Sequence, residues 1–182
     1  GWTVGIRWMY HERTVSGGSP YVTRAEGQRG GRGGSGARGL VRQMHAAGRL
    51  DQGKTRELIG EVHALGLVGS ALTGHVAEGI RSGATTEQSA AITRLFGGTT
   101  AVRNASIAFE LSGGAAVAWS EDEAEHGMNG VGYIMRQASC IGGGTTEMSR
   151  NVISERVLGM PRERTLDRDV AFREVPRSAP SR

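Results

Sequence analysis

The fold is decided by residues 141–161, which read Ile-Gly-Gly-Gly-Thr-Thr-Glu-Met-Ser-Arg-Asn-Val-Ile-Ser-Glu-Arg-Val-Leu-Gly-Met-Pro. Three glycines give a backbone that can approach a ligand closely. The two threonines and the glutamate after them favour the start of a helix, which we predict over 146–158. The first N–H groups and the positive dipole end of such a helix suit an anion or a polarised oxygen. The alternative is an ordinary helix start in which the glycines only make a turn.

Outside this stretch, the hydrophobic spacing predicts further helices and no strand. Apolar residues recur at helical intervals over residues 2–15, 40–47, 55–80, 86–111 and 131–140. Gly66 and Gly69 would let another helix approach the third of these, and Gly113 suits a left-handed helix end. Residues 120–127 read as a polar connector. We therefore predict an all-α fold, an antiparallel four-helix bundle.

Two segments lack the apolar content of a packed core. Residues 25–39 are rich in glycine and arginine, and we predict a flexible loop because they bury too little apolar surface to offset their ordering entropy. Residues 164–182 are charged, and we predict a loose tail. The chain has 182 residues, 30 of them glycine, and we expect one domain with an aliphatic core and close backbone contacts.

The composition limits the classes of function. The formal net charge of +4 is compatible with nucleic acid, with phosphorylated small molecules, or with a merely solvated basic surface. The Arg-Gly-Gly pairs at 29–34 resemble RNA-binding repeats, but they are few and have no interleaved aromatic residue, so we expect no nucleic-acid partner. No two histidines have the helical spacing of a ligand pair, and Cys140 is the only cysteine, so we expect no metal.

The same features bear on location. A single cysteine cannot form an internal disulfide, which suits a reducing compartment. No apolar run approaches the roughly 20 residues of a membrane span, and no signal peptide is evident. We therefore expect a cytoplasmic protein without a membrane partner. The chain begins at Gly1 inside a helix-like pattern, which reads as a fragment of a longer protein.

Three segments together resemble the C-terminal domain of the acyl-CoA dehydrogenase family. Residues 1–13, with Gly-Trp-Thr-Val at the start and Tyr-His-Glu-Arg at the end, resemble its first helix. Residues 109–119, with Phe-Glu-Leu-Ser-Gly-Gly-Ala and a final Trp, resemble a later helix end, and residues 141–161 resemble the last flavin-side loop and helix. Order and spacing fit residues 1–163, and the variant resembled is the divergent actinobacterial type. The resemblance implies a tetramer, homomeric or heteromeric, with FAD between subunits, an acyl-CoA substrate and an electron-transfer flavoprotein as acceptor.

The resemblance also implies a catalytic base. In the family, a carboxylate removes the α proton while a β hydride leaves, which gives the trans-2-enoyl-CoA. Many relatives carry that carboxylate at the position of Gly143, which has no side chain here. Others carry it on the first helix before an arginine, and that position is Glu12, followed by Arg13. Glu12 is therefore the expected base and Arg13 an expected substrate contact; the alternative is a surface carboxylate.

The glycine loop has its own implied role. The backbone N–H of Gly143 is expected to donate to the thioester oxygen and so to stabilise the enolate-like transition state. Gly144, Thr145 and Glu147 match positions that contact the flavin nucleotide in the family.

Two departures from the family pattern matter. An Arg-x-x-Phe-Gly segment that contacts flavin phosphate in a neighbouring subunit is missing; the arginines that could replace it are Arg24, Arg29, Arg32 and Arg38, and no spacing favours one of them. The family's N-terminal and middle domains are also absent from this chain, so we expect it not to be a competent enzyme alone. The alternative function is a non-catalytic subunit of a heteromeric dehydrogenase that supplies part of the flavin pocket.

Overall fold

The computed structural model describes residues 4–5, 36–118, 124–162 and 170–175, and within them the chain is entirely helical or irregular. The α-helices are α2 (Ala37–Ala46), α3 (Gly53–Arg81), α4 (Ala90–Ser112), α5 (Ala124–Met135) and α6 (Thr146–Val152). Short 3-10 segments are η2 (Glu87–Ser89), η3 (Gly113–Ala116), η5 (Arg136–Cys140) and η7 (Phe172–Glu174), and a π-helical turn, η6 (Ile153–Val157), follows α6.

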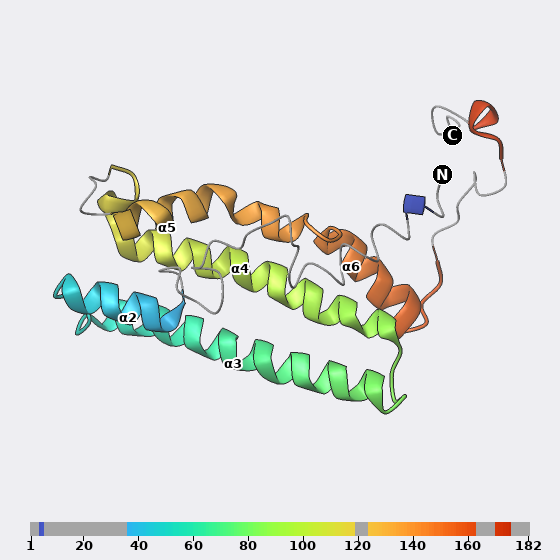
Figure 1. The fold of residues 1–182 in the computed structure, drawn as a ribbon, viewed down its shortest axis with the longest axis horizontal. Helices are drawn as coiled ribbons and strands as arrows, with labels where there is room; N and C mark the ends of the chain where they lie inside the picture. Colours follow the sequence, from blue (N-terminus) through green and yellow to red (C-terminus); the bar gives the residue numbers. More distant parts are fainter. Residues whose placement is uncertain (1–3, 6–35, 119–123, 163–169, 176–182) are drawn as a thin grey trace.

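The helices form an antiparallel bundle, which confirms the predicted all-α fold class. α3 and α4 are the two long helices and run in opposite directions (Figure 1). α5 and α6 run back along α4 on the side away from α3, and the short α2 packs against the start of α3 (Figure 1). Of the predicted first helix over 2–15, the structure describes Val4 and Gly5, which are helical, and the rest lies outside the described residues.

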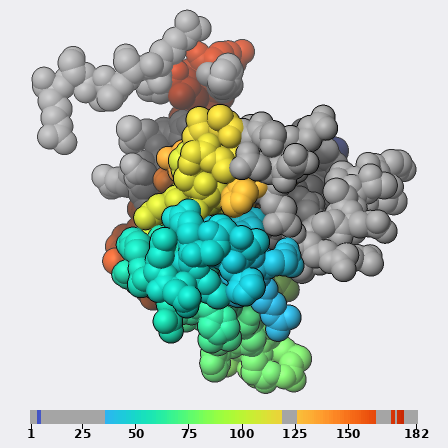
Figure 2. Space-filling model, turned by 90° about the vertical axis from the view of Figure 1, so that its left-hand side faces the viewer, coloured from blue at the N-terminus to red at the C-terminus, as the bar shows by residue number. Residues whose placement is uncertain are grey.

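The apolar core lies at one end of the bundle, where α2, the start of α3 and the end of α4 meet. Figure 2 views the molecule from this end. The core is aliphatic, as the composition predicted, because aromatic residues are scarce. Its buried members are Leu40, Met44, Leu58, Ile59, Val62, Ile107, Ala108 and Leu111. The Arg49 guanidinium closes this end by donating to the carbonyl of Leu111 at 2.9 Å.

The predicted boundaries of the fifth helix are wrong. We predicted a connector over 120–127 and a helix over 131–140, whereas α5 begins at Ala124 and residues 136–140 form a 3-10 turn. The glycines of α5 favour a connector by propensity. One of them instead permits close packing, because a Cβ on Gly130 would overlap the carbonyl oxygen of Ala116.

A buried polar side chain fixes α5 in this close position. The Asn129 amide donates to Gln43 Oε1 of α2 at 3.0 Å and to Ser112 Oγ of α4 at 2.8 Å. Because these groups are buried, losing either partner would leave polar atoms with neither a protein nor a water molecule to hydrogen-bond. The three helices are therefore joined at one point by side-chain hydrogen bonds as well as by packing.

Other boundaries were predicted closely. The two long helices match the predicted 55–80 and 86–111 within a few residues. Gly69 lies against the Phe96 ring as expected of a close approach, and Gly66 meets no neighbour. Gly113 has a positive φ of 58°, but its ψ of −135° differs from the left-handed helix end that we predicted. The predicted 25–39 loop is wrong at its end, because α2 begins at Ala37 and Gly39 is buried; residues 25–35 lie outside the described part.

Candidate active site

The glycine segment forms a bend between η5 and α6, as its sequence predicts. Gly143 and Gly144 have φ values of 74° and 108°, which residues with a side chain rarely adopt. The Gly144 N–H donates back to the carbonyl of Ile141 at 3.1 Å, which closes the bend. Thr145 then caps α6, with its hydroxyl accepting from the N–H of Met148 at 3.1 Å. The predicted helix start is confirmed.

The bend presents a backbone donor to the outside of the molecule. Gly143 is exposed, and within the described part of the chain no backbone carbonyl accepts from its N–H. Exposed N–H groups beside a helix N-terminus favour negative charge, because the helix dipole adds to their own. The bend can therefore hold a carbonyl oxygen or an anion through main-chain groups alone.

Glu147 adds a fixed negative charge at the first turn of α6. Its own backbone N–H and the Thr146 hydroxyl, at 3.0 Å, donate to the carboxylate and hold the pKa of Glu147 below its ordinary value. The Arg150 guanidinium lies 3.5 Å away and acts in the same direction. Glu147 is thus ionised at neutral pH and can accept hydrogen bonds but not donate them.

Arg94 of α4 holds the bend from the protein side, and the sequence analysis did not identify it. Its Nη2 donates to the carbonyls of Gly142 at 2.5 Å and of Gly144 at 2.9 Å. Gly98, one helical turn along α4, makes room for this side chain, since a Cβ there would lie 2.8 Å from Arg94 Nη1. No local sequence pattern connects Arg94 with glycines about 50 positions later.

The end of the last helix departs from regular α geometry. The Leu158 N–H donates to the carbonyl of Ile153 at 2.9 Å, the i to i−5 spacing of a π-turn, and the Met160 N–H donates to that of Ser154 at 2.8 Å. Gly159 follows with a φ of 68°, so the predicted helix end is confirmed. Glu155 and Arg162 pair at 3.0 Å across this end.

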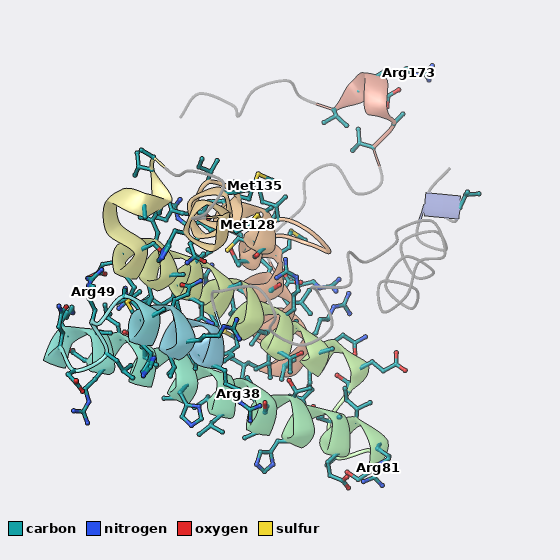
Figure 3. The ribbon with its side chains drawn as sticks, turned by 60° about the vertical axis from the view of Figure 1, so that its left-hand side comes forward. Arg38, Arg49, Arg81, Met128, Met135 and Arg173 are labelled. Carbon is teal, nitrogen blue, oxygen red and sulfur yellow. The ribbon has the colours of Figure 1, made fainter. Side chains whose placement is uncertain are left out.

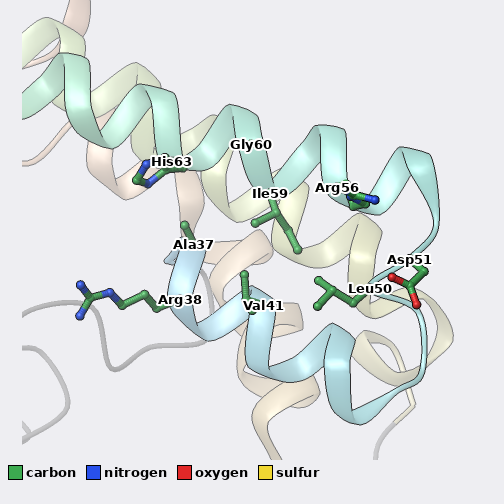
Figure 4. Close-up of a pocket in the computed structure, with 9 residues that line it drawn as sticks. All are labelled: Ala37, Arg38, Val41, Leu50, Asp51, Arg56, Ile59, Gly60 and His63. Carbon is green, nitrogen blue, oxygen red and sulfur yellow. The ribbon is translucent and has the colours of Figure 1, made fainter.

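A separate pocket of about 690 Å³ lies between α2 and α3. Figure 4 shows Val41, Leu50 and Ile59 directed into it. Arg38 and His63 lie at one end of the pocket, and Arg56 and Asp51 lie at the other (Figure 4). The volume is typical of a small-molecule site, and the lining combines an apolar floor with one basic end and one end of mixed charge. Of these residues the sequence analysis singled out only Arg38.

The pocket and the glycine bend are distinct places in one chain. Glu61, next to the pocket residue Gly60, pairs with Arg103 through contacts of 2.6 and 2.7 Å. Arg94 lies about 14 Å further along α4 at a rise of ~1.5 Å per residue. The pocket also opens between α2 and α3, whereas the bend lies between α5 and α6 (Figure 1).

The structure brings together four of the six predicted site residues, namely Gly143, Gly144, Thr145 and Glu147. Glu12 and Arg13 lie outside the described residues, so their position relative to the bend stays a prediction. In the described ranges, no group of three histidine, cysteine or acidic side chains is placed to bind a metal ion. No helix in those ranges is long and apolar enough to cross a membrane.

Comparison with known families agrees with this architecture. The family model described as the acyl-CoA dehydrogenase C-terminal domain matches residues 31–158, which is more than half of the chain. The chain belongs to this family of oxidoreductases, and its general role is of the acyl-CoA dehydrogenase type. The match includes both the pocket and the glycine bend and ends at Leu158. Comparisons with curated proteins and with solved structures found no match.

Proposed function

We propose that this chain forms the C-terminal part of an FAD-dependent acyl-CoA dehydrogenase that converts an acyl-CoA thioester to the trans-2-enoyl-CoA. The observation that carries the proposal is the exposed Gly143, whose N–H has no backbone acceptor in the described part of the chain and which lies just before α6, inside the region that matches the family. A preformed main-chain donor suits a reaction in which negative charge develops on a carbonyl oxygen.

Three groups of this chain act on the thioester, each in a different role. The Gly143 N–H donates to the thioester oxygen, which withdraws electrons from the α carbon and makes its proton more acidic. Glu12 accepts that proton as the general base, and Arg13 contacts the substrate beside it. When bound, FAD supplies the acceptor for the β hydride.

Residues of the bend also suit a flavin nucleotide. Gly144 and Thr145 allow close approach of the backbone, and the ionised Glu147 favours a hydroxyl or a ring N–H over a phosphate. We assign the phosphates to the α2–α3 pocket of a neighbouring subunit, because Arg38 and His63 supply basic groups at one end of it. Among the four arginines considered from sequence, Arg38 is therefore our choice.

This assignment of Arg38 predicts a specific loss of flavin affinity. Arg38→Gln removes the cation at the pocket and should raise the Kd for FAD about tenfold, as expected for one charge-assisted contact. Arg81→Gln, at the exposed end of α3, is the matched control and should leave the Kd unchanged. Fluorescence titration of apoprotein with FAD measures both. Equal Kd values for wild type and Arg38→Gln would contradict the assignment.

A subunit assembly is part of the proposal, because we assign the bend of one subunit and the α2–α3 pocket of its neighbour to the same flavin. α5 and the residue that follows η5 carry an exposed apolar stripe that suits such an assembly, and a second copy of this chain is the partner we propose. The stripe consists of Met128, Val131, Ile134, Met135 and Ile141. Met128 and Met135, labelled in Figure 3, lie about two helical turns apart on α5. An electron-transfer flavoprotein is the proposed electron acceptor.

The alternative is a non-catalytic subunit that contributes only part of the flavin pocket, which the missing Arg-x-x-Phe-Gly segment would favour. Anaerobic reduction of the flavin by an acyl-CoA separates the two. Full-length wild type should be reduced, and Glu12→Gln should slow the reduction about a thousandfold, as expected for a general base. Glu78→Gln, exposed on α3, is the control. If the flavin of Glu12→Gln is reduced as fast as that of wild type, Glu12 is not the base. If the flavin of neither protein is reduced, the non-catalytic alternative holds.

A further inference from the structure

We infer that Arg94 is the positioning residue for the amide donors of the glycine bend, an inference that rests on the proposed role of the Gly143 N–H. Arg94 is half-buried on α4, and its Nη2 donates to two carbonyls of the bend, those of Gly142 and Gly144. A single guanidinium nitrogen thus anchors the bend at two peptide groups.

Because peptide groups are planar, these two contacts also fix the directions of two N–H groups. In a planar trans peptide the C=O of one residue and the N–H of the next point in opposite directions. The described residues contain no cis peptide. Because the Gly142 carbonyl points to Arg94, the Gly143 N–H points away from it. The Gly144 carbonyl fixes the Thr145 N–H in the same way.

The bend needs hydrogen bonds from outside because its glycines have only weak conformational preferences of their own. Gly143 and Gly144 both have positive φ values, and glycine adopts many other conformations at little cost. Within the bend, the Gly144 N–H bond to Ile141 and the Gly142 N–H bond to Ala138 leave the Gly142–Gly143 peptide without an anchor of its own. Arg94 supplies that anchor from a long, regular helix.

The charge of Arg94 also acts on the strength of the donors. A peptide whose carbonyl accepts from a cation is polarised, so that its N–H becomes a stronger donor at the other end. Gly98 leaves room for the guanidinium, since any side chain there would occupy the space of Arg94 Nη1. Arg94 therefore acts through the Gly143 amide and need not touch the substrate.

Amide hydrogen exchange of the full chain, measured without substrate, tests this inference. In Arg94→Met the hydrogen-bonded amides of Gly142 and Gly144 should exchange about tenfold faster than in wild type, because the bend opens locally more often. Arg103→Met, on the same helix but paired with Glu61 and not with the bend, is the matched control and should leave these amides unchanged. Arg94→Lys keeps the charge without the planar fork and should give an intermediate rate.

A second readout uses the holoenzyme with an acyl-CoA. Arg94→Met should lower kcat about ten- to a hundredfold with little change in KM, because the donor matters most in the transition state. Unchanged exchange in both Arg94 variants overturns the inference even if the enzyme is active. Faster exchange in a protein that neither binds nor oxidises acyl-CoA overturns the proposed function and leaves the anchoring role of Arg94 intact.

Discussion

At the scale of single residues, the site depends on a glycine that acts through its backbone. Gly143 has a φ of 74°, where a Cβ atom meets its own main chain. A Cβ at this position would have space, since its nearest neighbour is Arg94 Nε at 3.7 Å. Strain in the backbone, and not crowding, therefore limits this position to glycine.

Gly143→Ala should lower the free energy of unfolding by about 1 kcal/mol, the typical cost of a left-handed conformation for a residue with a Cβ. Gly142→Ala is the matched control, because Gly142 has no positive φ and its Cβ would lie 3.4 Å from the Ala138 carbonyl oxygen. The control should stay within about 0.5 kcal/mol of wild type. Urea unfolding measures both, and equal losses in the two variants would contradict the strain argument.

The carboxylate of Glu147 makes a pH-dependent contribution. Hydrogen bonds from its own N–H and from Thr146 hold the pKa of Glu147 below the ordinary 4.5, so ionised Glu147 stabilises the fold. This stabilisation is present above pH 4.5 and is lost as the pH falls through the lower, folded-state pKa. The stability difference between wild type and Glu147→Gln should therefore be constant near neutral pH and shrink as the pH falls below 4.5. A difference that does not change with pH would refute this account.

What the sequence predicted at this scale was local. The Gly-Gly-Gly-Thr-Thr-Glu pattern was sufficient to place the bend and the Thr145 cap, because both are short-range effects. Arg94, Arg56 and His63 could not be predicted, since their roles arise only when helices distant in sequence pack together. Arg38 was one of four arginines that the sequence left open; it lines the pocket, and the other three lie outside the described residues.

At the scale of elements, α5 shows how glycine can serve packing inside a helix. Gly130 lies against the Ala116 carbonyl, closer than any side chain would permit, whereas Gly132 has no neighbour within 4 Å of an added Cβ. Two glycines on one helix thus have opposite consequences for stability.

Gly130→Ala should destabilise the protein by roughly 1–3 kcal/mol, since α5 must move away from η3 and strain the Asn129 hydrogen bonds. Gly132→Ala should stabilise it by about 0.8 kcal/mol through helix propensity alone. Thermal unfolding followed by circular dichroism compares the two. Both variants shifting in the same direction would show that the close contact at Gly130 does not determine stability.

The helices were predictable in proportion to their regularity. α3 and α4 were placed within a few residues because apolar residues recur at helical spacing over many turns, and this signal is stronger than that of isolated glycines. α5 was misplaced because propensity treats glycine as a breaker and takes no account of what the helix packs against. The π-turn after α6 has no signature in the local pattern that we used.

At the scale of the whole molecule, apolar surface is unevenly distributed. The buried core gathers at the α2 end, while the apolar stripe of α5 and Ile141 stays exposed, with Ile134 75% accessible. Exposed contiguous apolar side chains mark interaction surfaces in proteins. Together with a pocket and a bend that face different sides, the stripe supports assembly of more than one chain.

Ile134→Glu should raise the dissociation constant of the assembly at least about tenfold, because a charge would be buried in an apolar contact. His75→Glu, which places the same charge on an exposed position of α3, should leave it unchanged. Sedimentation velocity over a concentration series measures both. A monomer at all concentrations for wild type, or equal association of both variants, would contradict the proposed interface.

The central claim is that the Gly143 amide holds the thioester oxygen, and the carbonyl stretching frequency of bound acyl-CoA tests it most directly. The measurement uses full-length protein with its flavin already reduced, so that the thioester is not consumed, and a ¹³C label at the carbonyl. The account predicts a frequency lower than that of the same thioester in water, since a preorganised amide donor polarises the C=O bond more strongly. A bound thioester whose frequency equals or exceeds its value in water would contradict it.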